Sequence, residues 1–350
     1  MSTPDESNDD SDPRASAASS AQDRTLQQYH QWMQINAMSH LLRTARTSGV
    51  LDALRGGQKT LDQLCADLSL DTAITSLFLD ALISIGIVEQ YGEDFALARA
   101  AQLLCQYDHD FGDEAWSGLE QKLREGRPNV AAPEMDQAMV DHTAATQWSQ
   151  TGAAIQAAEI LNIGGEGEPQ GVRILDLGCG SAVFSCAIAH HDPQSTLVAV
   201  DHRGALQAAK STGDSIELSD RMELVEADLQ SGEMDWADTL DEASFDLVLL
   251  AQRLSVLSSE AAVSMLGVAA KLTKPGGRVV LVDVFRGQSR PTLTESIGAL
   301  RIATGTGAGY VRSLKEAQQL MLGAGLGEIQ FTYLAASREH LGMMVARKIT

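Results

Sequence analysis

A glycine turn between two apolar runs constrains the fold of this chain more than any other feature. The first run, residues 173–177, leads into Gly178 and Gly180, and the second run, residues 197–200, stops at Asp201. Glycine has no Cβ, so the backbone can turn tightly here and come close to a ligand. The pattern predicts a strand, a tight turn, a helix and a second strand whose tip carries an acid.

The acids around this turn indicate what it binds. Asp201 follows the turn by about twenty residues, the distance at which a carboxylate at a strand tip accepts both hydroxyls of a ribose. Val183 stands where a dinucleotide fold has its third glycine, and Asp176 precedes Gly178, which suits a cationic ligand better than a phosphate. S-adenosylmethionine carries a ribose, an ammonium group and a sulfonium but no phosphate, so we expect it as the ligand.

Further acids stand at the ends of later apolar runs. Asp228 follows residues 222–227 and is placed to accept a hydrogen bond from an adenine amino group, and Asp283 follows residues 278–282. Residues 245–250 form another such run. Because ligands of open α/β sheets bind outside the carboxyl ends of the strands, these acids are predicted to lie at one edge of a sheet.

The order of the motifs resembles that of the class I S-adenosylmethionine-dependent methyltransferases, and the motifs read ILDLGCGSA, VAVDHR, VEADL, FDLVLL and KPGGRVVLVD. More narrowly, residues 25–348 resemble the small-molecule O-methyltransferases of the plant caffeate and hydroxyneurosporene type. The resemblance implies an α/β fold: a Rossmann-like core with a seven-stranded sheet, its last strand antiparallel, preceded by a mostly α winged-helix domain. It implies these cofactor-binding residues: Asp176, Gly178, Gly180, Asp201, Asp228, Leu229 and Ala251.

The pattern along the chain predicts four segments. Residues 1–24 are rich in Ser, Asp and Ala, bury little apolar surface and are expected to be a disordered acidic tail. Residues 25–100 read as three helices followed by a hairpin, which is a winged helix-turn-helix. Residues 101–162 are a helical bridge that lines the acceptor pocket in the resembled family, and residues 163–350 are the S-adenosylmethionine-binding domain.

A winged helix often reads DNA, so a DNA-binding regulator is an alternative function. Residues 60–86 contain no Lys or Arg but do contain four aspartates, and this face would be repelled by a phosphate backbone. We therefore expect no nucleic-acid partner. In the resembled family the domain joins two subunits, which implies a homodimer, with Trp32, Met33 and Met38 as dimer, pocket or core residues.

The composition of the chain limits the partners and the cellular compartment that we expect for the protein. The formal net charge of -21 argues against nucleic acid and against anionic membrane surfaces, since both attract basic patches. The four cysteines form no C-x-x-C pair and have no histidine at zinc-site spacing, so no metal is expected. The sequence shows neither a membrane-spanning run nor a signal peptide, which predicts a cytoplasmic protein with reduced thiols.

One catalytic residue of the resembled family is missing. The family has a histidine after its fourth strand that deprotonates the acceptor hydroxyl, and Ser255 stands at the collinear position here. Serine has no proton affinity near neutral pH and cannot act as that base. The family's cationic residue four positions earlier is likewise replaced, by Ala251.

Three interpretations of Ser255 remain open at this point. In the first, the protein still transfers a methyl group to a small-molecule acceptor, and this acceptor needs little activation. A general base raises the rate by roughly 10²–10⁴-fold, and alignment of the two reactants can raise it by more. Alternatively another base serves, with His142 and Asp141 first and His202 next. In the third, the fold is diverted to a hydroxylase-like or decarboxylase-like reaction, or to binding without catalysis. Under the first interpretation the chain is an O-methyltransferase of secondary or pigment metabolism.

Overall fold

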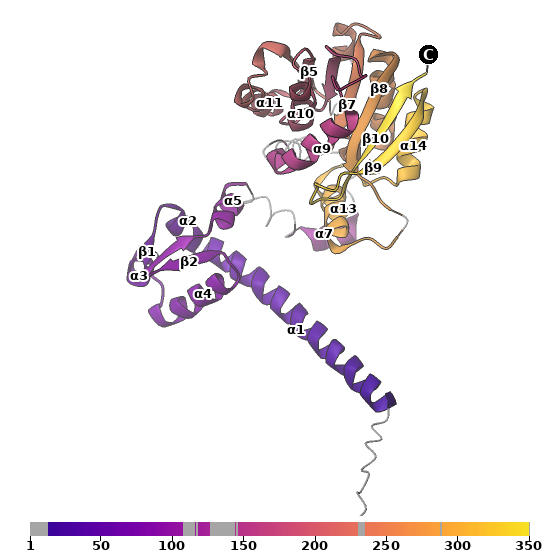
Figure 1. Cartoon of the computed structure of the whole chain (residues 1–350). Coiled ribbons are helices and arrows are strands. Elements are labelled where there is room, and N and C mark those ends of the chain that lie inside the picture. The colour runs from indigo at the N-terminus through magenta and orange to yellow at the C-terminus, as the bar shows by residue number, and fades with distance from the viewer. Residues whose placement is uncertain are drawn as a thin grey trace, which may run out of the picture. The chain divides into compact units, whose positions relative to one another are not determined.

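The computed structural model describes residues 13–107, 116, 118–126, 144, 146–229, 235–287 and 289–349. The chain divides into two compact units, Met1–Asp113 and Glu114–Thr350, which we call the N-terminal and the C-terminal unit. Figure 1 shows both units with their elements labelled. Across the residues described, every helix is too short or too polar to span a bilayer.

The N-terminal unit is a winged helix, as the sequence predicts. Its strands form a small antiparallel sheet in the order β1-β3-β2. The helices and strands are α1 (Pro13–Thr47), α2 (Val50–Arg55), β1 (Lys59–Thr60), α3 (Leu61–Leu68), α4 (Thr72–Ser84), β2 (Val88–Tyr91), β3 (Asp94–Leu97) and α5 (Arg99–Tyr107).

Local sequence signals start the helices of this unit. Thr60 and Gln63 form a capping box at α3: the Gln63 N–H donates to Thr60 Oγ1 at 3.2 Å, and the Thr60 N–H donates to Gln63 Oε1 at 2.9 Å. Asp71 caps α4 by accepting from the Ile74 N–H at 2.9 Å. The apolar faces of these helices then close one core that includes Leu64, Leu79 and Leu82.

Helix α1 starts earlier than the sequence pattern suggested. Disorder was expected for residues 1–24, whereas the structure has helix from Pro13 onward. Residues 14–21 include four alanines, and alanine has the highest intrinsic helix propensity. Low hydrophobicity prevents a segment from forming a core of its own, but it does not prevent a segment with this propensity from extending an adjoining helix.

The C-terminal unit contains a seven-stranded sheet in the order β6-β5-β4-β7-β8-β10-β9. Strands β4 to β8 pair in parallel, and β10 pairs antiparallel with both of its neighbours. The predicted sheet with an antiparallel last strand is thus confirmed. Its strands are β4 (Arg173–Leu177), β5 (Thr196–Asp201), β6 (Met222–Glu226), β7 (Phe245–Ala251), β8 (Thr273–Val284), β9 (Leu326–Tyr333) and β10 (Leu341–Lys348).

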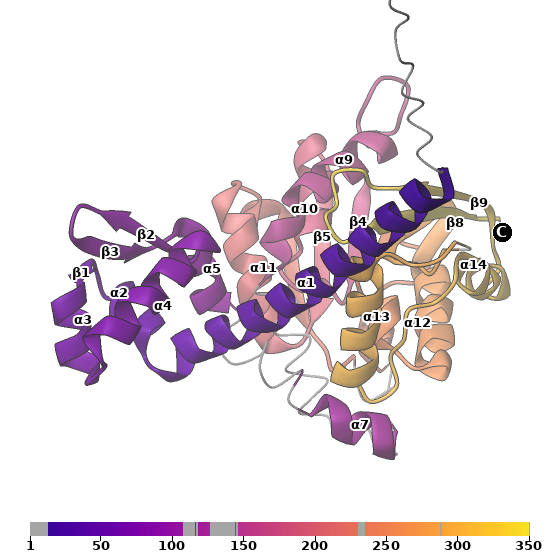
Figure 2. The same cartoon turned by 90° about the horizontal axis from the view of Figure 1, so that it is seen from below.

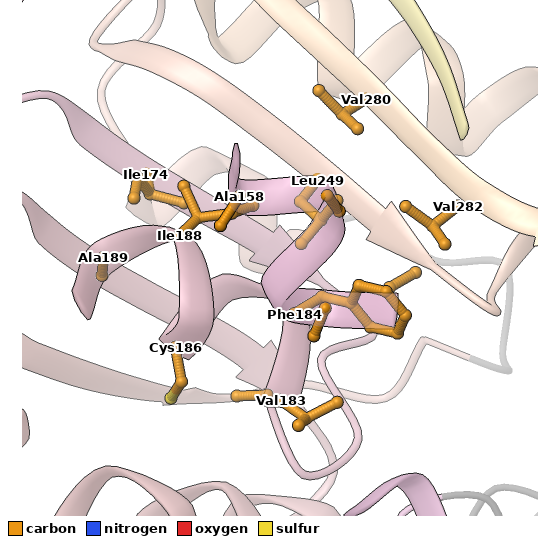
Figure 3. Packing of buried hydrophobic residues seen from close by; sticks show 14 of the residues in the cluster. Ala158, Ile174, Val183, Phe184, Cys186, Ile188, Ala189, Leu249, Val280 and Val282 are labelled. Carbon is orange, nitrogen blue, oxygen red and sulfur yellow. The ribbon is translucent and has the colours of Figure 1, made fainter. Parts of the chain in front are cut away.

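Helices cover both faces of this sheet (Figure 2). Neighbouring strand residues alternate between two cores: Ile174 packs with α9 and α10 (Figure 3), and Leu175 packs with α12 and α14. Burial on both faces explains the nearly continuous apolar runs. The helices are α7 (Leu119–Glu125), α9 (Thr151–Leu161), α10 (Val183–His191), α11 (Arg203–Ser215), α12 (Ser259–Leu272), α13 (Leu293–Gly305) and α14 (Leu314–Gly323), with short 3-10 turns η1 (Gln147–Gln150), η2 (Ser219–Arg221), η3 (Asp235–Thr239) and η4 (Leu254–Val256).

Candidate active site

The glycine turn directly follows β4. Gly178 has φ 75° and Gly180 has φ 55°, in the left-handed region that glycine adopts without a Cβ penalty. A Cβ at Gly178 would lie 2.5 Å from Arg253 Cδ, and one at Gly180 would lie 2.8 Å from Gln147 Oε1. Both glycines are therefore required for two reasons, the backbone angle and the closeness of a neighbouring side chain.

Asp201, at the tip of β5, lies against this turn. Its Oδ2 accepts from the Gly180 N–H at 2.9 Å, and its Oδ1 accepts from His202 N and Nδ1 at 2.8 and 2.9 Å. Burial raises the pKa of this carboxyl, but the His202 hydrogen bonds, the charge of Arg253 and the Gly180 N–H together hold its pKa below the ordinary value. Asp201 is thus a buried, ionised acceptor at the place where the sequence predicts a ribose contact.

Asp176 lies in β4, fully buried beneath the turn. Ser185 Oγ donates to its Oδ2 at 2.5 Å, and its Oδ1 has no hydrogen-bond partner among the residues described. Burial, together with the nearby charge of Asp201, raises the pKa of Asp176 to about 7, although the Ser185 hydrogen bond opposes this. A carboxyl poised near neutrality is sensitive to any charge that arrives next to it.

Four of the predicted cofactor residues surround one narrow slot: Gly178, Gly180, Asp201 and Ala251. The remaining wall comes from Gln147, Gln252, Arg253 and Val256. The slot encloses a cavity of about 20 Å³, room for roughly one water molecule. Leu229 reaches it through its carbonyl, which accepts from Arg253 Nη2 at 3.0 Å, whereas Asp228 is exposed and outside the slot wall.

The sequence analysis missed the two side chains that fill this slot. Arg253 is almost completely buried and lies against Gly178. Gln147 lies against Gly180, and its Oε1 accepts from Ser181 N and Oγ at 2.9 and 3.0 Å. The position of Arg253 directly after an apolar strand was the one sequence signal that it could lie in the site. No sequence signal pointed to Gln147, because it is far from the glycine turn along the chain.

A larger cavity of about 270 Å³ lies beside the slot. Gln147, Gln252 and Val256 line both cavities, so they form a common wall. The other lining residues come from η1, η4, β8, α13 and the loop before β10; they include Gln150, Ser255, Asp283, Arg301 and Glu339. Two cavities that share a wall can bring two ligands together; we call the smaller one the nucleoside slot, after the ligand that the sequence predicts for it.

Ser255 faces this larger cavity next to a buried acid. The Ser255 N–H donates to Asp283 Oδ2 at 2.8 Å, and the Val284 N–H donates to Asp283 Oδ1 at 2.8 Å. Burial raises the pKa of Asp283 above its ordinary value, against the hydrogen bonds from Ser255 and the charge of Arg312. The sequence placed Asp283 at a strand end but did not pair it with Ser255.

A buried arginine fixes the turn that carries Ser255. Arg312 donates from Nη1 to the Leu254 carbonyl, and from Nη2 to the carbonyls of Leu257 and Ser258 at 2.9 and 3.0 Å. Its guanidinium stacks 4.4 Å from the centre of the Tyr310 ring. The position of Ser255 is therefore set by the structure around it. His142 and Asp141, the alternative bases, lie outside the described residues.

Comparison with known proteins is consistent with this geometry. Residues 174–277 match the model of the methyltransferase domain family. This segment begins in β4 and ends within β8, so it includes the glycine turn, Asp201 and the strand that leads to Arg253.

Solved structures of methyltransferases have the same fold over almost the whole chain. Human N-acetylserotonin methyltransferase in complex with S-adenosylmethionine is 20% identical, with 98% of this chain and 100% of that chain covered and a TM-score of 0.68. The mitomycin 7-O-methyltransferase is 17% identical, with coverage of 95% and 99% and a TM-score of 0.70. An O-methyltransferase family protein from Burkholderia thailandensis is 17% identical, with coverage of 92% and 98% and a TM-score of 0.68.

Together these findings define the class. Residues 174–277 form a methyltransferase domain, and the chain has the fold of S-adenosylmethionine-dependent methyltransferases of known structure. The likeness extends over the winged helix as well as the sheet, because 98% and 95% of this chain are covered.

Proposed function

We propose that the chain transfers a methyl group from S-adenosylmethionine to an oxygen atom of a small-molecule acceptor, as an O-methyltransferase of secondary or pigment metabolism. The observation that carries this proposal is the common wall of Gln147, Gln252 and Val256 between the nucleoside slot and the 270 Å³ cavity. Such a wall lets an acceptor approach one end of a cofactor while both remain shielded from water.

The backbone and the acids of the slot fit this cofactor. Asp201 is an ionised acceptor for ribose hydroxyls, and the two glycines permit close backbone approach. Asp228, exposed after β6, remains the candidate for the adenine amino group. The cofactor supplies an electrophilic methyl group on a sulfonium. The side chains of Arg253 and Gln147 occupy the slot in this conformation, so they have to move before it can be filled.

Asp283 is the acid best placed to accept a proton from the acceptor hydroxyl. It borders the larger cavity beside Ser255, and its raised pKa makes it a stronger base than an ordinary aspartate. Ser255 holds this carboxylate through hydrogen bonds from its side chain and its backbone N–H, and it does not need to titrate itself. His142 remains the alternative base from the sequence.

We further propose that the chain is a homodimer joined through α1. Apolar side chains along α1 are exposed, with Trp32 62% accessible. Leu26, Trp32 and Met38 point in three different directions around the helix, given 3.6 residues per turn. Helix α1 carries these exposed apolar side chains among many polar ones, and a second copy of the N-terminal unit would cover them.

A second candidate function is nucleoside binding without methyl transfer. One observation favours it: Ser255 stands where the resembled family has its histidine. The two candidates differ in whether a methyl group leaves the cofactor.

A labelling experiment tests the proposal. The purified protein is mixed with S-adenosylmethionine labelled in its methyl group and with a panel of phenols and hydroxyquinones, and transfer is followed by extraction into organic solvent. Label in the extract, absent without protein, supports methyl transfer. Calorimetric binding of S-adenosylhomocysteine without label transfer to any acceptor in the panel would favour the second candidate instead.

A further inference from the structure

Arg253 crosses the nucleoside slot from one strand end to another. It follows β7, and its Nη2 donates to the carbonyl of Leu229 beyond β6 at 3.0 Å. Between these points its aliphatic stem lies against Gly178, where Cδ and Cγ would be 2.5 and 2.9 Å from a Cβ. The side chain thus lies over the glycine that gives the backbone its close approach to a ligand.

The charge of Arg253 is balanced inside the slot. Asp201 forms part of the same wall, and the guanidinium contributes to the lowered pKa of this carboxyl. A charged side chain buried at this depth is costly unless it is paired and hydrogen-bonded. The Leu229 carbonyl and the Asp201 charge offset part of this cost, whereas Arg253 Nε makes no hydrogen bond within the described part of the chain.

Gln147 closes the other end of the slot in the same way. It lies on η1, and its Oε1 accepts from both Ser181 donors, while its Nε2 donates to Gln252 Oε1 at 3.3 Å. The slot that remains between Gln147 and Arg253 measures about 20 Å³. A nucleoside is many times larger than the single water molecule that such a volume holds.

We propose that Arg253 is a plug of the cofactor slot: its side chain competes with the nucleoside for the space over Gly178 and thereby sets the affinity for the cofactor. This inference rests on the proposed function. Binding requires the guanidinium to leave the Leu229 carbonyl and the neighbourhood of Asp201, which frees Asp201 to accept the ribose hydroxyls.

The plug lowers affinity through the population of the open state. When only a fraction of molecules is open, the apparent dissociation constant equals the intrinsic one divided by that fraction. A slot open in about a tenth of the molecules therefore binds about tenfold more weakly than one that is always open. Substitution of Arg253 by a smaller residue should therefore tighten the binding of every ligand that places a ribose and an adenine in the slot. The gain should be the same for ligands with and without a positive charge at sulfur.

Calorimetry on four full-length proteins tests the plug. The proteins are the wild type, Arg253→Ala, Arg253→Met and the control Lys210→Ala, which removes an exposed cation on α11 that pairs with Asp214. Each is titrated with S-adenosylhomocysteine, S-adenosylmethionine and adenosine. Arg253→Met keeps a long side chain over Gly178 but cannot donate to the Leu229 carbonyl, and it serves as the second variant if Arg253→Ala does not fold.

We expect Arg253→Ala to bind all three ligands at least tenfold more tightly than the wild type, Arg253→Met to fall in between, and Lys210→Ala to match the wild type. Equal or weaker binding by both Arg253 variants would overturn the plug and leave the proposed function standing. A gain confined to S-adenosylmethionine would overturn it as well, because charge repulsion and not occupied space would be the cause. Absence of binding by all four proteins would overturn both the plug and the proposed function.

Discussion

Asp176, Asp201 and Asp283 are three buried carboxylates at one edge of the sheet, and their surroundings shift their pKa values in different directions. Burial dominates for Asp176 and Asp283 and raises both pKa values. For Asp201, hydrogen bonds from His202 and the charge of Arg253 outweigh burial and lower the pKa. These differences support the different roles proposed for the three acids: an ionised acceptor, a proton acceptor and a charge-sensitive group.

Asp201→Ala should weaken the binding of S-adenosylhomocysteine by about 1.5–3 kcal/mol, the usual contribution of hydrogen bonds to a charged group. The reason is the loss of the carboxylate that accepts ribose hydroxyls. Isothermal titration calorimetry measures the change, and Asp201→Asn, which keeps the shape but not the charge, is the matched control. Unchanged affinity in Asp201→Ala would remove Asp201 from the cofactor site.

Asp176→Asn should stabilise the protein at alkaline pH. The folded-state pKa of about 7 lies above the ordinary 3.8, so the folded protein retains a proton that the unfolded chain releases. The free energy of unfolding therefore falls as the pH rises between these two values. The full cost of ionising Asp176 in the folded protein, at most about 4 kcal/mol, is present above pH 7. Asparagine does not ionise and avoids this cost.

Urea unfolding of the wild type and Asp176→Asn at pH 5, 6.5 and 8 measures this effect. The advantage of the variant should be largest at pH 8 and should shrink toward pH 5. A difference in unfolding free energy that grows as the pH falls would have the wrong sign and would show that Asp176 is ionised and stabilising in the folded state.

Asp283→Asn should lower the rate of methyl transfer by roughly 10²–10⁴-fold at neutral pH, the usual contribution of a general base. The wild-type rate should reach a plateau above the pKa of Asp283, whereas the variant should gain about tenfold per pH unit until the acceptor itself ionises. Ser255→Ala should have a much smaller effect.

A pH–rate profile for these proteins and for His142→Ala shows which residue acts as the base. A plateau that vanishes in His142→Ala and persists in Asp283→Asn would make His142 the base.

At the scale of elements, α1 differs from the other helices of the N-terminal unit. The caps and apolar faces of α3 and α4 are used within their own unit, where Leu64 and Leu79 are fully buried. The first part of α1 contributes nothing to that core, and its apolar side chains stay exposed. These exposed side chains support the dimer proposed above.

The double variant Trp32→Lys, Ile35→Lys should be a monomer. Two charges on a helix enclosed by a partner would be buried without counterions, which is unfavourable. Light scattering coupled to size exclusion measures the mass. Both positions are exposed in the single chain, so the melting temperature of the monomeric unit should change little. A wild-type chain that runs as a monomer at all concentrations would contradict the proposed dimer.

At the scale of the whole molecule, the net charge of -21 decides which partners can approach. The winged helix has the shape of a DNA-binding module, but its helices α3 and α4 carry no Lys or Arg. We expect no measurable affinity for duplex DNA at any salt concentration. Fluorescence anisotropy with a labelled duplex is the test, and an affinity that rises steeply as salt is lowered would indicate phosphate binding and refute this expectation.

The elements and their order can be read from the amino-acid sequence. Capping residues such as Thr60 and Asp71, the alternation of apolar faces and the glycines at positive φ act over a few residues, so they can be read locally. The same holds for Gly178, Gly180, Asp201 and their common place at a strand end. The parallel sheet with an antiparallel last strand followed from the family resemblance and from the apolar runs.

What fills the site depends on the folded chain. Arg253 and Gln147 line the same slot over the glycine turn although about a hundred residues separate them, and no local pattern encodes this arrangement. The pairing of Ser255 with Asp283 likewise depends on how β8 and η4 come together, with Arg312 holding the turn. Side-chain positions over a ligand slot depend on packing between distant segments and on the shared desolvation of their charges, which become defined only when the chain is folded.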